Sequence, residues 1–380
     1  MSDDYQGEFE LFSSERRRSC HDVARAFEPA RLTQARILAE FTKAELAEAV
    51  HVSAAAIGQY EAGATTPRPE ILPVLARVLK VPVEFFATGR PLGRLDAAEA
   101  HFRSLRSTRA KDRAKAATHA EQVWELTYAL EKRVRLPDVS LPTVPEGASP
   151  SEAARITREV WRIEPGPLAH LAATIEAHGI VVTLIPLTNK AITRVSAYST
   201  SALGRPLIIA TPERAASIYR YRFTCAHELG HLLLHSNPLP GDRQQEREAD
   251  EFAAELLTPH TQIEALLPRT IRMAALDRLS TSWGVSIESL IRRMGELRIV
   301  SDVSVRRAYQ RLNNMAAFRR DEPIATYRGE VPSLLKDALS LAEQHGLTRA
   351  QLASELCWST QHLSEVLGDA DSRPQLHIVK

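Results

Sequence analysis

Two histidines and a glutamate in one short stretch are the residues best suited to chemistry in this chain. They occur as His227-Glu228-Leu229-Gly230-His231, inside an apolar run that favours a helix. Residues four apart project from one face of a helix, so His227 and His231 can hold one Zn²⁺ at about 2.0–2.1 Å from each ring nitrogen. Glu228 is adjacent to the first ligand, where its carboxylate can reach a metal-bound water as a general base. The spacing predicts a zinc-dependent hydrolase, with Mn²⁺ as the alternative metal.

A second predicted helix, over residues 245–259, supplies acidic residues for a third ligand. A catalytic zinc takes three protein ligands and water, and two histidines with one glutamate form a standard set. Glu246 and Asp250 are one turn apart on one face of this helix. Glu246 can bind the metal while Asp250 accepts the second ring N–H of a ligand histidine. We expect Glu248 and Glu251, on other faces, to be solvated.

His235 is a rival ligand because it lies four residues after His231 and on the same face. The three-histidine zinc motif instead places its last histidine six residues after the second, so we expect His235 not to bind the metal. Cys225 lies on a different face and is expected to be a small core residue. The sequence does not decide which residue stabilises a transition-state oxyanion; the candidates are Tyr198, Tyr219, Tyr221 and His178.

The elements that must position these residues form an α+β region. A β-branched run at 180–185 predicts a strand, and the runs at 195–199 and 206–210 predict two more. The helix that carries His227 is expected to span 212–235, after a helical segment at 151–176. The sequence therefore predicts a small sheet followed by the metal-binding helix and a second helix.

The N-terminal region predicts a bundle of short helices. Apolar residues at helical spacing indicate a helix from residue 29, then helices over 43–50 and 54–62. Thr42 and Ser53 are suited to cap the last two. Two short helices joined by a tight turn form a helix-turn-helix.

This region also carries a family pattern. Its residues are Thr42-Lys43-x-Glu45-Leu46-Ala47, Val52-Ser53, Ile57, Tyr60-Glu61-Ala62-Gly63, Thr66-Pro67-Arg68-Pro69, Leu75 and Val81. With them the chain resembles the lambda-repressor-like (XRE) helix-turn-helix family over about residues 29–88. The resemblance implies that 53–60 is the recognition helix in the major groove of a double-stranded DNA operator, and that the protein is a homodimer.

The recognition positions depart from that family in their chemistry. Ala54 and Ala55 can touch only a thymine methyl, which leaves Gln59 as the long polar side chain of that face. The residues expected at phosphates, which position the protein without reading sequence, are Thr42, Lys43, Ser53 and Arg68. The alternative is a helix-turn-helix used for protein contacts.

The middle region carries a second family pattern. Its residues are Arg222-Phe223-Thr224-x-Ala226-His227-Glu228-Leu229-Gly230-His231-Leu232-Leu233-Leu234-His235 and Glu246-x-x-Ala249-Asp250-x-Phe252-Ala253-Ala254-x-Leu256-Leu257-x-Pro259. They resemble the ImmA/IrrE-type metallopeptidases over about 151–310. The resemblance implies a gluzincin-like site with His227, His231 and Glu246 as ligands and Glu228 as base. It also implies a protein substrate, which is a lambda-repressor-like partner or the chain itself.

Composition sets wider limits. The 380 residues suggest two or three domains, and the net charge of +1 confines any nucleic-acid site to a local patch. The three cysteines are scattered, which fits a reducing cytoplasm. Apolar runs stay below the length of a membrane span, so we expect a cytoplasmic protein without a membrane partner.

These observations predict a mainly α protein with an α+β middle domain and five regions. The regions are a mobile tail at 1–26, the helix-turn-helix domain at 27–90, a helical connector and Pro-rich linker at 91–150, the metallopeptidase domain at 151–314, and a C-terminal helical module and tail at 315–380. Residues 347–368 echo the first helix-turn-helix. A dimerisation or packing module is favoured there over a second DNA reader.

The parts together predict a transcriptional regulator whose metallopeptidase domain cleaves itself or a repressor after stress or DNA damage. Two alternatives stay open: a regulator whose peptidase-like domain is a non-catalytic ligand or metal sensor, and a phage- or defence-associated regulator.

Overall fold

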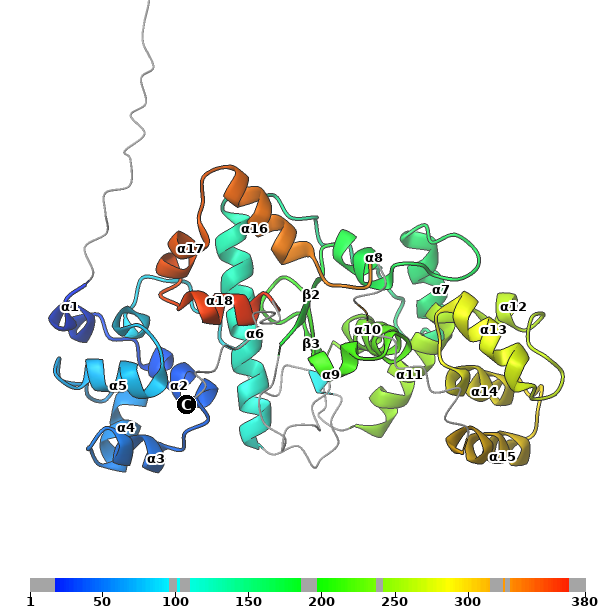
Figure 1. Ribbon diagram of the computed structural model, residues 1–380, viewed down its shortest axis with the longest axis horizontal. Coiled ribbons are helices and arrows are strands. Elements are labelled where there is room, and N and C mark those ends of the chain that lie inside the picture. Colours follow the sequence, from blue (N-terminus) through cyan, green and yellow to red (C-terminus); the bar gives the residue numbers. More distant parts are fainter. Residues whose placement is uncertain are drawn as a thin grey trace, which may run out of the picture. The chain divides into compact units, whose positions relative to one another are not determined.

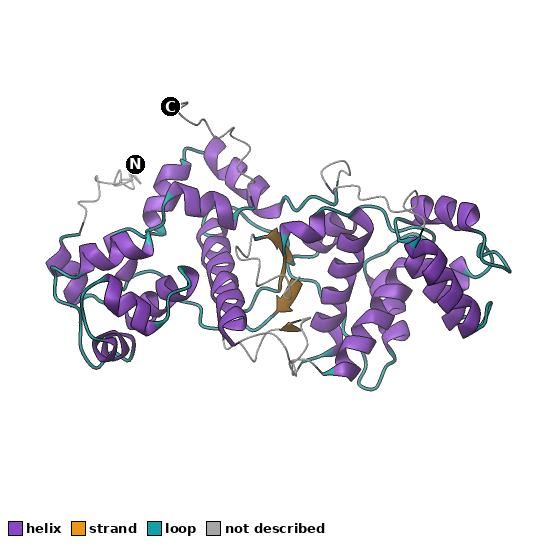
Figure 2. Cartoon of the chain, turned by 60° about the horizontal axis from the view of Figure 1, so that its bottom comes forward, coloured by secondary structure: helices purple, strands orange, loops and turns teal. Residues whose placement is uncertain are grey.

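A computed structural model describes residues 18–95, 101–102, 110–185, 197–236, 242–314, 324 and 329–368. Contacts divide the chain into two compact units, residues 1–90 with 357–359, and residues 91–356 with 360–380. The chain is mainly helical with a small sheet in its middle region, as the sequence predicts (Figures 1 and 2). Among the described residues no helix is long and apolar enough to cross a membrane.

The N-terminal unit is a bundle of short helices. Its elements are α1 (Cys20–Arg25), α2 (Pro29–Leu38), α3 (Lys43–Ala49), α4 (Ala54–Glu61), α5 (Leu72–Leu79) and the 3₁₀ helix η1 (Val83–Phe86). Thr42 and Ser53 cap α3 and α4, as expected, because their hydroxyls accept the orphan backbone N–H groups of Glu45 and Ala56. The helix-turn-helix geometry predicted for this region is therefore present.

The predicted mobile tail ends earlier than expected. Residues 1–17 lie outside the described part, but Cys20–Arg25 form α1. Ser19 and Asp22 make a reciprocal capping box, and Val23 is fully buried. The expected mobile tail through residue 26 is therefore wrong over Cys20–Arg25. One buried valine in a polar segment gives no apolar periodicity from which this helix could be predicted.

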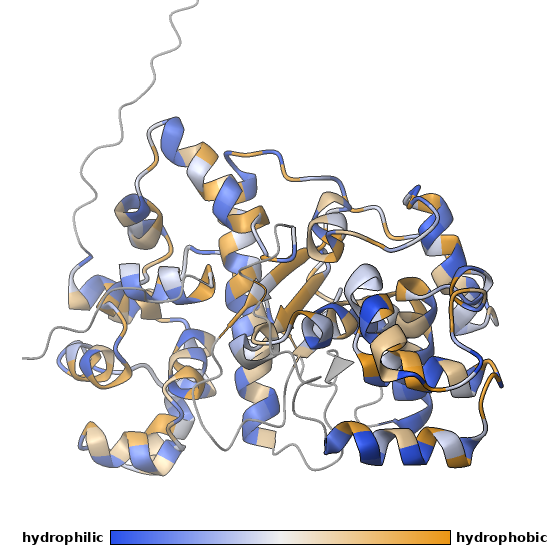
Figure 3. Cartoon of the chain, turned by 45° about the vertical axis from the view of Figure 1, so that its right-hand side comes forward, coloured by the Kyte–Doolittle hydropathy of each residue, from blue (hydrophilic) through white to orange (hydrophobic). Residues whose placement is uncertain are grey.

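A four-stranded sheet organises the second unit, with the order β1 (His101–Phe102), β3 (Ala197–Thr200), β4 (Leu207–Ala210) and β2 (Val181–Leu184). β2 is parallel to β4, and Val181 is in register with Leu207. β3 is antiparallel to both β4 and β1. β2 and β4, whose residues are mostly apolar, are coloured as hydrophobic in Figure 3, as expected for strands of a sheet covered on both faces. The three predicted strands are confirmed, and the two-residue β1 was too short to predict.

Helices cover the two faces of this sheet, and adjacent residues of β3 show how. The Tyr198 hydroxyl donates to the carbonyl of Ala116 in α6 (Ala110–Glu131) at 2.7 Å. The next side chain, Ser199, contacts Glu228 in α10 (Ile218–Leu234). Successive strand residues point to opposite faces, so α6 and α10 lie on opposite sides of β3 (Figure 1).

The predicted connector is part of this unit's core. The apolar side chains of α6 at Val123, Leu126 and Leu130 are fully buried. α6 packs against β4 and against two C-terminal helices, α16 (Leu334–Gln344) and α18 (Thr360–Val366). The apolar side chains of this helix are therefore covered within the chain.

The remaining helices are α7 (Pro150–Val160), α8 (Leu171–Ala177), α9 (Pro212–Ala215), α11 (Arg243–Leu257), α12 (His260–Ile263), α13 (Met273–Trp283), α14 (Ile287–Glu296), α15 (Asp302–Asn313) and α17 (Arg349–Glu355). Of these helices, α7, α8, α9 and α11 contact α10. The single helix predicted over 212–235 is wrong, because Ser217 adopts an extended backbone that separates α9 from α10. The helices expected in the C-terminal module are present as α16, α17 and α18.

Candidate metal centre

The centre is built where α10 and α11 pack closely together. A Cβ atom on Gly230 of α10 would lie 3.0 Å from the Phe252 ring and 3.3 Å from the Cα of Ala249, both in α11. Those two residues are fully buried. The glycine therefore lets the two helices approach, which brings the acidic face of α11 over the histidines of α10.

The structure brings the three predicted ligands together. The Nε2 atoms of His227 and His231 are 3.0 Å apart, and they lie 3.6 and 3.7 Å from the carboxylate oxygens of Glu246. Tetrahedral zinc ligands at about 2.0–2.2 Å from the metal stand about 3.3–3.5 Å from one another. Two nitrogens and one carboxylate at these separations fit zinc. The histidines are buried, whereas Glu246 is 30% exposed.

The outer nitrogen of His227 has a carboxylate partner. Asp250 Oδ1 lies 2.8 Å from His227 Nδ1, the hydrogen-bond arrangement that the sequence predicted for Asp250. Its other oxygen accepts from Arg292 of α14 at 3.3 Å. Burial opposes the charge of Arg292, but Asp250 and Glu296 hold its pKa above the ordinary value. Asp250 is thus a carboxylate that orients His227 with Nε2 facing the other ligands.

The outer nitrogen of His231 has a different partner, His235. Their Nδ1 atoms are 2.9 Å apart, and His235 Nε2 donates to Glu248 at 3.0 Å. Burial opposes the Glu248 charge, but hydrogen bonds from His235 and Gln244 lower its pKa. An ionised Glu248 needs the proton on His235 Nε2, so His235 Nδ1 accepts from His231. This leaves His231 Nε2 free of its proton, as a metal ligand requires.

Glu248 is less exposed than the sequence predicted, because it bonds to His235. The sequence predicted a solvated side chain, but Glu248 is two-thirds buried against His235. His235 lies outside the group of atoms that could share one metal ion, which contains His227, His231 and Glu246. It acts instead on the far side of His231.

Glu228 is fully buried and oriented by a residue that sequence reasoning missed. The Ser199 hydroxyl lies 2.9 Å from Glu228 Oε2 and 3.2 Å from the Glu228 carbonyl oxygen. Ser199 comes from β3, so the sheet face that covers α10 also fixes the predicted base. The only sequence signal was a small polar residue inside a buried strand.

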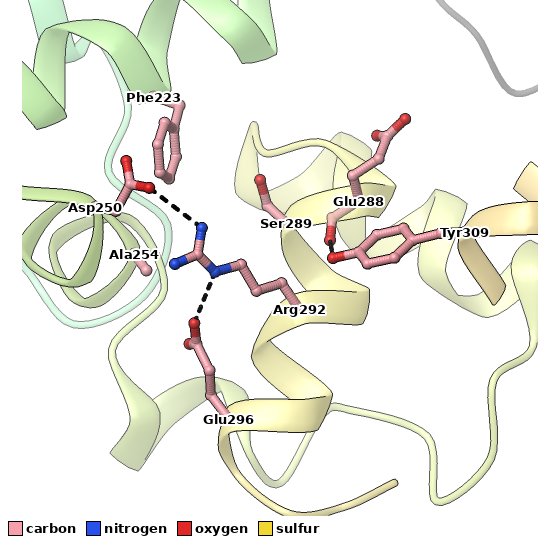
Figure 4. Close-up of a pocket in the computed structure, with 8 residues that line it drawn as sticks. All are labelled: Phe223, Asp250, Ala254, Glu288, Ser289, Arg292, Glu296 and Tyr309. Carbon is pink, nitrogen blue, oxygen red and sulfur yellow. Dashed lines mark hydrogen bonds and ion pairs between the residues drawn. The ribbon is translucent and has the colours of Figure 1, made fainter. Parts of the chain in front are cut away.

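A cavity of about 310 Å³ adjoins the centre through Asp250 (Figure 4). Its lining includes Arg292, whose guanidinium lies between Asp250 and Glu296 in the figure. The three candidate ligands are not among the lining residues, which are Phe223, Asp250, Ala254, Glu288, Ser289, Arg292, Glu296 and Tyr309. The cavity therefore borders the outer partner of His227.

Two of the four suggested oxyanion partners are engaged elsewhere. The Tyr198 hydroxyl donates to Ala116, and His178 stacks on Trp161 with ring centroids 4.2 Å apart. Burial holds the pKa of both Tyr198 and Tyr221 well above the ordinary value. Tyr219 is partly buried, as His178 is, but has no such role in the described part of the chain. Cys225 is a buried core residue, as expected.

The residues predicted to contact DNA lie in the N-terminal unit. Ala54, Ala55 and Gln59 are exposed on α4, and Arg68 is exposed in the loop that follows. Lys43 is about half exposed and forms an ion pair with Glu61 at 3.2 Å. Thr42 and Ser53 are exposed helix caps, so their hydroxyls already bond to backbone N–H groups.

Family comparisons agree with this division. Residues 175–294 match the model of the IrrE N-terminal-like domain of peptidase family M78, and residues 32–86 match a helix-turn-helix model. The first range contains α10, α11 and the candidate metal centre, and the second contains α3 and α4. No curated protein matches the chain.

Proposed function

We propose that this chain, which joins a helix-turn-helix DNA-binding domain to an IrrE N-terminal-like domain, is a transcriptional regulator with a zinc-dependent peptidase activity. The substrate we infer is the chain itself or a repressor partner, cleaved in response to stress such as DNA damage. A homodimer on a palindromic operator is the expected DNA-bound form.

One observation carries the peptidase proposal. Two buried imidazole nitrogens and a carboxylate converge within 4.8 Å, and a buried glutamate precedes the second histidine by three residues. Each ligand histidine has an outer partner that fixes its tautomer, which a chance cluster of polar groups does not require.

The residues divide the chemistry between them. Zinc held by His227, His231 and Glu246 would supply a water ligand whose pKa is lowered to about 7. Glu228 accepts a proton from the attacking water and returns it to the leaving amine. Ser199 holds the Glu228 carboxylate in one orientation through its hydroxyl. Asp250 and His235 keep the two ligand rings fixed, so little reorganisation accompanies the reaction.

Glu228→Gln separates metal binding from catalysis. We expect the variant to bind about one zinc per chain, as the wild type does, because Glu228 is not a ligand. Its cleavage products should be absent when both proteins are incubated with zinc or manganese, with and without single-stranded DNA, and fragments are mapped by mass. His227→Ala should lose most of the metal.

The outcomes distinguish the candidate functions. Cleavage that persists in Glu228→Gln would remove Glu228 from the role of base. A wild type that binds zinc but yields no fragment under any condition would favour the metal or ligand sensor. A wild type that binds no metal at all would contradict both the peptidase and the metal sensor.

A further inference from the structure

The C-terminal helices α17 and α18 repeat the helix-turn-helix of the N-terminal unit. Residue 349 begins α17 as residue 43 begins α3, and residue 360 begins α18 as residue 54 begins α4. The offset is 306 residues at both starts. The repeated segment lies outside the two ranges that match family models.

The local geometry of the two segments is the same at the cap. Thr42 and Glu45 form a capping box on α3, with bonds of 3.2 and 2.7 Å. Thr348 and Gln351 form the equivalent box on α17, with bonds of 3.1 and 2.7 Å. Both boxes fix where the first helix of the pair begins.

The turn between the helices is also repeated. His51 has φ 57° between α3 and α4, and Cys357 has φ 50° at the same offset between α17 and α18. A non-glycine residue in this left-handed region is uncommon. Lys80 after α5 and Arg298 after α14 share this conformation, so the feature supports a repeat through its identical offset in both turns.

The burial pattern follows the same register. Leu46, Ala47 and Val50 are buried in the first segment, and their equivalents Leu352, Ala353 and Leu356 are buried in the second. The core residue of the second helix is Ile57 in α4 and Leu363 in α18. The identical pairs are Thr42 with Thr348, Ala44 with Ala350, Leu46 with Leu352, Ala47 with Ala353, and Ser53 with Ser359.

The two segments differ where a recognition helix meets bases. Ala54 and Ala55 of α4 are replaced by Thr360 and Gln361 in α18, and both replacements are exposed. Alanine offers bases only a methyl group, whereas glutamine makes paired hydrogen bonds to adenine. At these two positions the second helix pair therefore carries the base-reading chemistry that the first one lacks there.

The docking of α18 within its unit leaves this face uncovered. The His362 ring bonds to Gln122 of α6, and the Val366 carbonyl accepts from Thr183 of β2 at 3.2 Å. On a helix of 3.6 residues per turn, 362 and 366 lie opposite 360, 361 and 364, whereas Glu365 borders them, with its carboxylate 3.7 Å from His362 Nδ1. Gln361 and Glu365 bond to each other at 3.0 Å on the outer face. They correspond to Ala55 and Gln59 of α4.

We infer that residues 348–366 are a second DNA reader, in which α18 enters the major groove and Gln361 reads an adenine. Arg349 takes the place of Lys43 beside the backbone phosphates, and Glu365 is placed to accept from a cytosine amino group. The inference rests on the proposed DNA-binding function and extends it, because the operator would then contain two separately read elements. It replaces the packing or dimerisation module that the sequence favoured.

The test selects binding sites for the full chain from a pool of duplexes randomised over about 40 base pairs, long enough for two half-sites one or more helical turns apart. All proteins carry Glu228→Gln, so that self-cleavage cannot separate the two readers. We expect Gln361→Ala to lose an adenine preference in one element and to weaken the best wild-type duplex about 5- to 150-fold. Gln361→Arg should change that preference to guanine, which a misfolded variant cannot imitate.

Matched variants assign the outcome. Gln59→Ala should alter the other element, and Gln344→Ala, an exposed glutamine at the end of α16, should alter neither. If Gln361→Ala and Gln361→Arg both select the wild-type motif while Gln59→Ala does not, the second reader is overturned. It is also overturned if the two Gln361 variants change only the sedimentation of the protein. A wild type that selects no motif would instead refute the proposed DNA-binding function itself.

Discussion

At the scale of single residues, the candidate centre depends on what lies behind its ligands. His227 bonds outward to Asp250, and His231 bonds outward to His235. Outer partners of this kind commonly change metal affinity by about 10–100-fold when they are removed. The two partners are chemically different, a carboxylate and an imidazole, so each can be tested alone.

His235→Ala should raise the Kd for zinc by about 10–100-fold, because His231 loses the acceptor that fixes its tautomer. Glu248→Gln should have a smaller effect, since its amide oxygen still accepts from His235. Competition with a chromophoric chelator measures both. His260→Ala is the matched control, because His260 Nδ1 lies 2.8 Å from Glu255 and away from the centre. Equal zinc affinity in His235→Ala and His260→Ala would contradict the role of His235.

Ser199→Ala should retain zinc but slow peptide cleavage by about tenfold or more, since a buried carboxylate loses a hydrogen bond worth about 1.5–3 kcal/mol. The measurement is the cleavage rate together with the zinc content of each protein. Thr183→Ala is the control, because it removes another buried hydroxyl from the same sheet, 3.2 Å from Val366. If the two variants cleave equally fast, Ser199 has no special part in orienting Glu228.

The sequence could predict the part of the site that lies on single helices. His227 and His231 are related by helical spacing alone, and so are Glu246 and Asp250. Ser199 and Arg292 could not be found in this way, because β3 and α14 reach the centre only through tertiary packing. The DNA-contact residues were likewise inferred from local sequence patterns, and they remain predictions.

At the scale of elements, the approach of α10 to α11 sets the centre. Gly230→Ala places a methyl group 3.0 Å from the buried Phe252 ring and 3.3 Å from the α11 backbone, so α11 must shift. We expect a loss of about 1–3 kcal/mol in unfolding free energy and a severalfold weaker zinc affinity. Gly58→Ala is the control, because a Cβ at that helical glycine meets nothing within 4 Å. Unchanged zinc affinity in Gly230→Ala would show that the helices tolerate the methyl group.

The junction between α8 and α16 predicts a pH effect. Glu176 accepts the backbone N–H groups of Ser333 and Leu334, and burial raises its pKa from 4.5 to about 7. The folded state therefore binds a proton that the unfolded chain releases between these values. The stabilisation that this bound proton gives the folded state is complete below pH 4.5 and is lost as the pH rises through about 7.

Relative to Glu176→Gln, the wild type should lose about 2–3 kcal/mol of unfolding free energy between about pH 5 and about pH 8. Urea unfolding of both proteins at the two pH values measures the difference. Glu152→Gln, at an exposed glutamate of α7, should keep the wild-type dependence. Parallel pH profiles for wild type and Glu176→Gln would exclude the raised pKa.

Local signals predicted most elements but not their partners. The β-branched run at 180–185 indicated β2, and the caps at Thr42 and Ser53 indicated α3 and α4. The burial of α6 was not predictable, because α16 and α18 lie about 200 residues or more later in the chain. The break before α10 depends on one extended residue, Ser217, which has no strong sequence signature.

At the scale of the whole molecule, the two units bury separate sets of core residues. Leu32, Leu46, Ile57, Leu72 and Phe86 belong to the N-terminal unit. The core around α10, α11 and the sheet belongs to the second unit, as does the candidate metal centre. A ligand that binds only the folded form of one unit stabilises that unit alone.

Urea unfolding of the full chain should therefore show two transitions. Zinc should raise the urea midpoint of only one of them. At a free zinc concentration of about 100 times Kd, the second unit should gain about 2.7 kcal/mol while the N-terminal transition stays in place. Far-UV circular dichroism follows both transitions. Tryptophan fluorescence also reports both, because Trp161 and Trp283 lie in the second unit and Trp358 is grouped with the N-terminal unit. His227→Ala is the control and should abolish the zinc shift without moving the N-terminal transition. A single transition that zinc moves as a whole would mean that the units unfold together, so that metal loading at the centre would also stabilise the DNA-binding domain.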